Sequence, residues 1–308
     1  MVRPGSGFFV ASLATLAVFV ASLAAAGTVT ASSAPVSATF AAVGPFATTT
    51  GTITDGTAIY DVFRPSDYEG LGFKSPIVTW GNGTGAVPTD YTTLLSHFAS
   101  YGFTVIATTL PNTGSGREID AAARYLVKAD STPGSVFAEH LNVHAVAAAG
   151  HSQGATGAVR TANMDPRLIT AVMTFSLPSL KFSAPNPDCP VKTDCEYQLN
   201  RVTQPIFFIA THGPVDAFIT DPANERADFG SIKGRAAVGL ISASEGRRAD
   251  HASVEDSDVG GNPGDELGYA TAWLEYTLRS NKQASDAFSG RHPELVSDPN
   301  WPGSMVKQ

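Results

Sequence analysis

The chain alternates between continuous apolar runs and segments whose apolar residues recur with a helical period. The apolar runs are rich in valine, isoleucine, alanine and phenylalanine, which is typical of strands covered on both faces of a sheet. We expect strands at residues 58–65, 76–82, 104–110, 143–150, 168–175, 205–212 and 236–244.

The segments between these strands predict helices. In DYTTLLSHFASYG, four residues share one helical face: Tyr91, Leu94, Leu95 and Phe98. REIDAAARYLVKAD, the segment after Ser152 and DELGYATAWLEYTLRS also have helical patterns. Such alternation predicts an α/β fold, with a mostly parallel central sheet and helices on both faces. A chain of 308 residues could form two domains, but no repeat or linker follows residue 45, so we expect one.

The N-terminal pattern differs from the rest. Arg3 precedes an apolar and small-residue stretch at 8–26, and no acidic residue occurs before Asp55. This arrangement predicts a secretory signal at residues 1–31, cleaved after Ala31, with Ala38 as an alternative site. An uncleaved membrane anchor is the other interpretation, because the apolar stretch is long for a signal.

We therefore expect a flexible segment at 32–45 and a catalytic domain at 46–308, exported to an extracellular or periplasmic location without a stable membrane anchor. The formal net charge is −8 and no basic run stands out, which argues against nucleic acid as a partner. Cys189 and Cys195 predict a local disulfide in an exported chain, since no second Cys or His pair stands at metal-ligand spacing.

The candidate chemistry begins at GHSQG, residues 150–154. A buried strand precedes it and small, helix-compatible residues follow, as a nucleophile elbow requires. Gly150 and Gly154 stand at the positions where a tight turn leaves no room for side chains. The pattern predicts Ser152 as a nucleophile; a serine of purely structural importance is the alternative.

A nucleophilic serine needs a histidine base and an orienting carboxylate, which in α/β hydrolases follow in the order Ser, Asp, His. Asp216 stands on a turn just past the strand at 205–212, with Asp221 as its rival and a turn-capping role as the alternative. His251 follows the next strand and is preferred as base over His212. Asp250 adjoins His251, but its side chain points elsewhere on an extended backbone.

The remaining histidines are His97, His140, His144, His151 and His292. The first three are expected to pack in the core or lie on the surface. His151 flanks Ser152 directly, and His292 lies beyond the terminal helix.

An oxyanion hole needs two main-chain N–H groups. Gln153, next to the nucleophile, supplies one; the glycine-rich loop WGNGTGA supplies the other, from Asn82 in preference to Gly83. This loop has no phosphate-binding spacing. Its match to a glycosylation sequon at Asn82 is taken as accidental.

From about Tyr60 to Ser257 the chain resembles the secreted cutinase-like and polyethylene terephthalate hydrolase-like polyesterases, near the dienelactone hydrolase and chlorophyllase-like α/β hydrolases. The resemblance rests on SPIVTWGNGTGA, LLSHFASYGFTVIATT, GHSQG, the strand before Asp216, and DHAS. It implies an α/β-hydrolase fold without a large lid domain. The implied site consists of Ser152, Asp216 and His251, with the amides of Asn82 and Gln153.

The chain departs from the plastic-degrading members of that group. They carry an aromatic residue in place of Asn82, a methionine in place of Gln153, and a tryptophan where this chain reads FSLPSL. An aromatic clamp for a terephthalate ring is therefore not visible in the sequence.

These features predict an exported serine ester hydrolase that forms an acyl-enzyme, needs no cofactor or metal, and acts as a monomer. We expect a shallow, open site for short-chain or polymeric esters, with polyethylene terephthalate among the candidates. The alternatives are amide or thioester hydrolysis and a catalytically inert binding protein.

Overall fold

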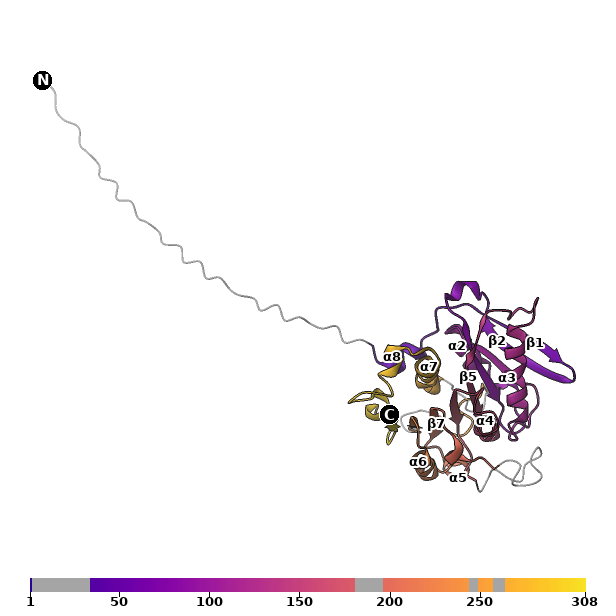
Figure 1. Ribbon diagram of the computed structural model, residues 1–308. Helices are drawn as coiled ribbons and strands as arrows, with labels where there is room; N and C mark the ends of the chain where they lie inside the picture. Colours follow the sequence, from indigo (N-terminus) through magenta and orange to yellow (C-terminus); the bar gives the residue numbers. More distant parts are fainter. Residues whose placement is uncertain (2–33, 181–195, 244–248, 257–263) are drawn as a thin grey trace. The chain divides into compact units, whose positions relative to one another are not determined.

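A computed structural model describes residue 1 and residues 34–180, 196–243, 249–256 and 264–308 (Figure 1). The chain divides into the units Met1–Ser33 and Ala34–Gln308, and the sheet and helices described below all belong to the second. The predicted signal peptide and the pair Cys189 and Cys195 lie outside the described residues. Within the described part of the chain, no helix has both the length and the apolar character needed to cross a bilayer.

A single mixed sheet forms the centre of the second unit, and its strand order is β1-β2-β4-β3-β5-β6-β7-β8-β9. The strands are β1 (Thr48–Asp55), β2 (Ala58–Pro65), β3 (Ser75–Gly81), β4 (Thr104–Thr108), β5 (Leu141–His151), β6 (Ala171–Phe175), β7 (Ile206–Thr211), β8 (Ala236–Ile241) and β9 (Met305–Lys307). Strands β4, β3, β5, β6, β7 and β8 pair in parallel, whereas β1, β2 and β9 join antiparallel.

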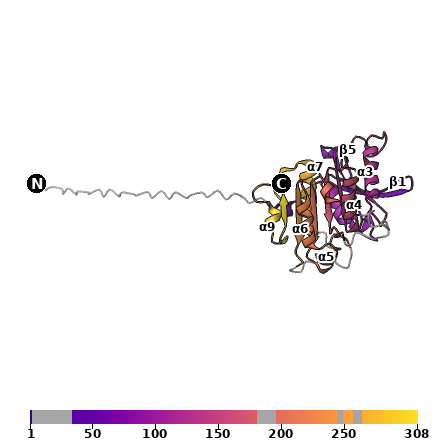
Figure 2. The ribbon, with the colours of Figure 1, turned by 60° about the horizontal axis from the view of Figure 1, so that its bottom comes forward.

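Helices cover both faces of this sheet (Figures 1 and 2). They are α1 (Val36–Ala41), α2 (Thr92–Ser100), α3 (Arg117–Asp130), α4 (Gln153–Met164), α5 (Pro214–Ile219), α6 (Pro222–Ser231), α7 (Gly264–Arg279), α8 (Lys282–Ser285) and α9 (Glu294–Ser297). The core on one face draws on α1, α2 and α7, and the core on the other draws on α3, α4 and α6. The expected α/β class, with a mostly parallel sheet between two helical layers, is confirmed.

The central strands are apolar because both of their faces are covered. Every residue of β3, β4, β6, β7 and β8 is buried. Successive side chains point to opposite faces, so Trp80 of β3 enters one core while its neighbour Thr79 points to the other face, where its hydroxyl donates to Ile119 O on α3. The continuous apolar runs in the sequence follow directly from this double burial.

The segment at 32–45, which we expected to be flexible, contains a packed helix instead. Val36 and Phe40 of α1 are buried in the same core as α7. The carboxylate of Glu294 accepts hydrogen bonds from the main-chain N–H groups of Val36 (2.6 Å) and Ser37 (2.8 Å). These two donors begin the helix and would otherwise lack partners. A cut after Ala38 would remove both of them, whereas a cut after Ala31 leaves them in place.

The parallel arrangement brings four loops to one edge of the sheet. Ser152 follows β5, Ser176 follows β6, Asp216 follows β7 and His251 follows β8. In open α/β sheets this edge, beyond the carboxyl ends of the strands, is where ligands bind.

Candidate active site

Ser152 stands on a strained turn between β5 and α4. Its backbone has φ 53° and ψ −122°, a left-handed φ that non-glycine residues rarely adopt. A Cβ on Gly150 would lie 2.3 Å from Gly154 O, and a Cβ on Gly154 would lie 2.1 Å from Gly81 O. Only glycine fits at these two positions, so the close approach of β3, β5 and α4 fixes the turn that carries Ser152.

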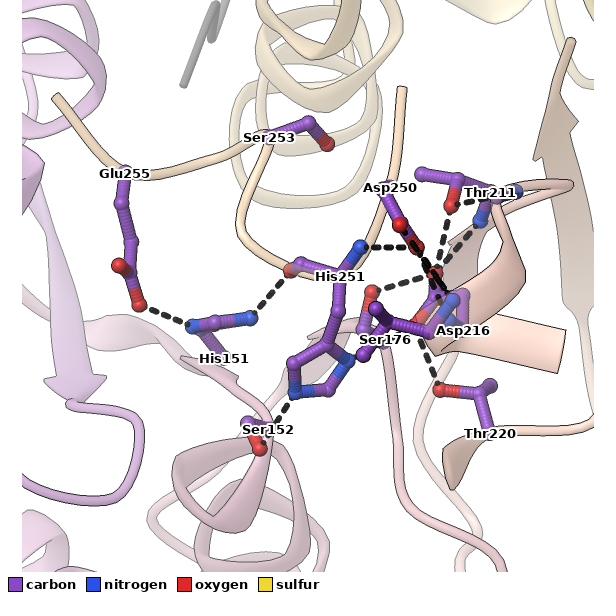
Figure 3. A network of polar contacts seen from close by, with 12 residues as sticks. His151, Ser152, Ser176, Thr211, Asp216, Thr220, Asp250, His251, Ser253 and Glu255 are labelled. Atoms are coloured by element: carbon purple, nitrogen blue, oxygen red, sulfur yellow. Dashed lines mark hydrogen bonds and ion pairs between the residues drawn. The ribbon is translucent and has the colours of Figure 1, made fainter. Parts of the chain in front are cut away.

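Ser152, His251 and Asp216 form a continuous hydrogen-bonded chain (Figure 3). Ser152 Oγ lies 2.9 Å from His251 Nε2, and His251 Nδ1 lies 2.8 Å from Asp216 Oδ1. A carboxylate only accepts, so Nδ1 carries the proton and Nε2 is free to accept the proton of the serine hydroxyl. The three residues predicted from their order in the sequence are thus brought together in the arrangement of a nucleophile, a base and an orienting acid.

Asp216 is fully buried but well supplied with donors. Besides His251, its carboxylate accepts from the Thr211 amide (2.8 Å), the Thr211 hydroxyl (2.9 Å), the Ser176 hydroxyl (2.8 Å) and the Thr220 hydroxyl (2.9 Å). Burial alone raises the pKa of this carboxyl, but the hydrogen bond and charge of His251, with the Thr211 and Ser176 donors, bring the pKa below its usual value. Asp216 is therefore an ionised partner for His251.

Asp250 has a different task from its neighbour His251. Its carboxylate accepts from the main-chain N–H groups of Val215 and Asp216 (both 3.0 Å to Oδ1), at the start of α5, and from that of His251 (2.8 Å). It therefore ties the loop that carries the base to the helix that carries the acid. As expected, its side chain does not orient the His251 ring, although Asp250 and His251 lie in a bend and a turn and not on an extended backbone.

The two candidate oxyanion residues lie on adjoining segments, since a Cβ on Gly154, the residue after Gln153, would lie 2.6 Å from Asn82 O. The Gln153 amide is the first N–H of α4, and such groups have no acceptor within their own helix. Asn82 is buried, and its side-chain amide donates to Thr108 O (2.7 Å) and Leu110 O (3.0 Å), which fixes the loop after β3. This buried amide is also sterically inaccessible to a glycan. The rival Gly83 N–H is already used, since it donates to the Tyr91 hydroxyl at 2.9 Å.

The rival acid and base lie elsewhere. Asp221 caps α6 by accepting from Ala223 N. His212 is exposed, with Nε2 3.4 Å from Pro302 O. The other histidines away from Ser152 are also placed outside this chain of contacts: His97 is buried against Phe40 O, His140 stacks on Tyr68, and His144 and His292 are exposed.

His151 is a site residue that its sequence pattern did not single out. Its side chain is only 2% exposed, and its Nε2 lies 2.7 Å from the main-chain carbonyl of His251. Its Nδ1 faces the Tyr91 hydroxyl (3.0 Å) and Glu255 Oε1 (3.2 Å). The order Ser, Asp, His rules out His151 as the base, but its place within the elbow could have marked it as a neighbour of the base.

The geometry supports nucleophilic catalysis by a serine. Among the described residues, no cluster of three or more His, Cys, Asp or Glu side chains could hold a metal ion. No protein-family model matches the chain, and no curated protein is detectably similar to it. The case for a function therefore rests on the chemistry of the site itself.

Proposed function

We propose that this chain is an exported serine hydrolase of carboxylic esters, acting on short-chain or polymeric substrates. The observation that carries the proposal is the chain of hydrogen bonds Ser152–His251–Asp216 on a left-handed turn at the edge of the sheet. Export rests on the sequence of residues 1–31 alone.

In the first half-reaction, Ser152 Oγ attacks the ester carbonyl carbon while His251 Nε2 accepts the hydroxyl proton. The ionised Asp216 stabilises the imidazolium that forms. The amides of Asn82 and Gln153 donate to the oxyanion of the tetrahedral intermediate. Because Gln153 begins α4, the positive end of the helix dipole adds to this stabilisation.

The intermediate then collapses. The bond between the carbonyl carbon and the alkoxy oxygen breaks, the alcohol leaves with the proton from His251, and an acyl ester on Ser152 remains. In the second half-reaction, His251 takes a proton from water, which attacks the acyl carbon. The acid is released as Ser152 recovers its proton.

The test is turnover of p-nitrophenyl acetate, butyrate and palmitate by the purified chain, with Ser152→Ala as the comparison. We expect release of p-nitrophenol from the short esters and a loss of roughly 10⁶-fold in Ser152→Ala. A fluorophosphonate probe should label the parent chain but not the variant. A correctly folded chain that neither turns over these esters nor reacts with the probe would overturn the proposal, and turnover of amides or thioesters alone would change the substrate class.

A further inference from the structure

A second set of polar side chains lies on the side of His251 away from Asp216. It consists of Tyr91, His151 and Glu255, which we call the Tyr–His–Glu cluster. Figure 3 shows His151 between Glu255 and the main chain of His251, while Asp216 approaches the His251 ring from the opposite side. The rings of His151 and His251 are close, with centroids 5.0 Å apart.

The partner of His151 Nε2 shows that this nitrogen carries a proton. The carbonyl of His251 can only accept, so Nε2 carries a proton and donates it across 2.7 Å. Burial lowers the pKa of His151, while the hydrogen bond and charge of Glu255 beside Nδ1 act in the opposite direction. Burial raises the pKa of Tyr91 well above its usual value, so its hydroxyl keeps its one proton, with His151 Nδ1 (3.0 Å) and Glu255 Oε1 (3.3 Å) both within reach.

The Tyr91 hydroxyl also holds the loop that follows β3. It accepts the N–H of Gly83, the residue next to Asn82, at 2.9 Å. A Cβ on Gly83 would lie 2.9 Å from His151 Nδ1 and 3.0 Å from the Tyr91 hydroxyl. Glycine at this position therefore lets the loop pack directly on both rings.

Glu255 completes the cluster from the loop that carries His251. Its Oε1 lies 3.2 Å from His151 Nδ1 and 3.3 Å from the Tyr91 hydroxyl. Burial raises the pKa of this carboxyl, but the hydrogen bond and charge of His151, with the Tyr91 hydroxyl, bring it below its usual value. Glu255 therefore holds a negative charge beside His151.

We propose that Tyr91, His151 and Glu255 are positioning residues. They hold the catalytic base His251 in a fixed position relative to the loop after β3 that contains Asn82. The path runs from Gly83 through the Tyr91 hydroxyl and the His151 ring to the carbonyl of His251, and Glu255 contacts both the Tyr91 hydroxyl and His151 Nδ1. The cluster touches no reacting atom and acts through the main chain at Asn82–Gly83 and at His251. This inference rests on the proposed ester hydrolysis, since it assigns residues that support that reaction.

The variant Tyr91→Phe removes the hydroxyl that contacts Gly83, His151 and Glu255, and Glu255→Gln removes a negative charge; both keep the side-chain shape. We expect kcat for p-nitrophenyl acetate to fall roughly 10- to 100-fold in Tyr91→Phe and less in Glu255→Gln, because small misplacements of reacting groups slow the chemical step. KM should change less than about twofold, since neither residue holds the ester. At His151, a glutamine can place a donor near the position of Nε2 while an asparagine cannot. His151→Gln should therefore retain more activity than His151→Asn.

Tyr68→Phe is the matched control. Tyr68 is also a buried tyrosine, and its hydroxyl is hydrogen-bonded to Thr104 Oγ1 (2.8 Å) in the core on the other face of the sheet. Both tyrosine variants should lower the midpoint of thermal unfolding. Only Tyr91→Phe should lower kcat.

The double variant Tyr91→Phe with Glu255→Gln tests whether the residues act through one path. Residues of one network give non-additive effects, so the double variant should lose little more than the worse single variant. An unchanged kcat in both single variants, or equal losses in Tyr91→Phe and Tyr68→Phe, would overturn the inference. If Tyr91→Phe fails to fold, the kcat values of Glu255→Gln and of the two His151 variants test the inference in its place. Failure of the proposed function itself would be recognised separately, by absent or Ser152-independent turnover in the parent chain.

Discussion

Two buried carboxyl groups, Asp216 and Glu225, have opposite surroundings. Both side chains are fully buried. Asp216 accepts five hydrogen bonds, from His251, Ser176, Thr220 and both the amide and hydroxyl of Thr211. Glu225, on α6, has far fewer donors: among the described residues only the main-chain N–H of Leu177 acts to lower its pKa, and neither carboxyl oxygen accepts a hydrogen bond of good geometry.

The donors and the neighbouring charges move the pKa values of the two groups in opposite directions. The pKa of Asp216 is below its usual value despite burial, whereas burial and the negative charges of Asp216 and Asp228 raise the pKa of Glu225 well above its usual value. Burial alone therefore does not determine whether a carboxyl group is ionised. Asp216 has the charge that a triad requires, whereas the raised pKa of Glu225 favours its neutral form.

The largest expected effect is that of Asp216→Asn. An asparagine keeps the shape but loses the charge, and it can no longer hold the His251 tautomer that leaves Nε2 free. We expect kcat for short p-nitrophenyl esters to fall on the order of 10⁴-fold, by analogy with the same change in serine proteases. A loss of less than tenfold would show that Asp216 does not act as the acid.

Thr220→Val should have an intermediate effect. Thr220 donates to Oδ1 of Asp216, the oxygen that also accepts from His251, and valine has nearly the same shape without the hydroxyl. Loss of a hydrogen bond to a charged group costs about 1.5–3 kcal/mol, and we expect this in the free energy of unfolding measured with urea at pH 7. The kcat should fall only a few-fold, because four of the five donors remain.

The pH dependence of stability gives Thr220→Val a second readout. The folded pKa of Asp216 is lowered, so its contribution to stability is present above the unfolded value of 3.8 and is lost as pH falls through the folded pKa. Removing a donor raises the folded pKa, so the variant should lose this contribution at a higher pH. Thr161→Val is the control, since its buried hydroxyl donates to Gly116 O and Gly157 O, away from the triad. The interpretation would be contradicted if Thr161→Val raised the pH at which this contribution to stability is lost by as much as Thr220→Val does.

Glu225→Gln should have the smallest effect on turnover, within about twofold, because a neutral amide replaces a neutral acid of the same shape. Its effect on stability should depend on pH. The unfolded chain ionises Glu225 near 4.5 while the folded chain keeps it protonated, so stability falls as pH rises from about 4.5 through the folded pKa. Glutamine does not titrate. The stability of the variant relative to the parent chain should therefore be greater at pH 8 than at pH 5, measured by chemical denaturation.

Most of the sheet could be predicted from the sequence because strands buried on both faces consist mainly of apolar residues. The strands β2 to β8 correspond to the apolar runs, with ends shifted by up to a few residues. β1 was not predicted, since its threonine-rich segment is exposed along most of its length, and β9 has only three residues. α1 was not predicted because a six-residue helix held by a distant carboxylate has no local signal.

The candidate site was predictable only where chain order and strand ends mark it. Ser152 has a local motif, and Asp216 and His251 follow strands in the required order. The supporting residues have no such signal: Tyr91 and Glu255 are in contact although they are 164 positions apart. Ser176 and Thr220 are ordinary loop and helix-end residues until the fold places their hydroxyls on Asp216.

The backbone at the site also limits how this protein can be made more heat-resistant. Ser152 and Ser176 both have left-handed φ values, 53° and 52°, and each such residue costs on the order of 1–3 kcal/mol. Glycine at either position would relieve that strain but would remove the nucleophile or a donor to Asp216. Thermostability and turnover therefore compete at these two serines, and gains in one without loss of the other have to come from substitutions far from the carboxyl ends of β5 and β6.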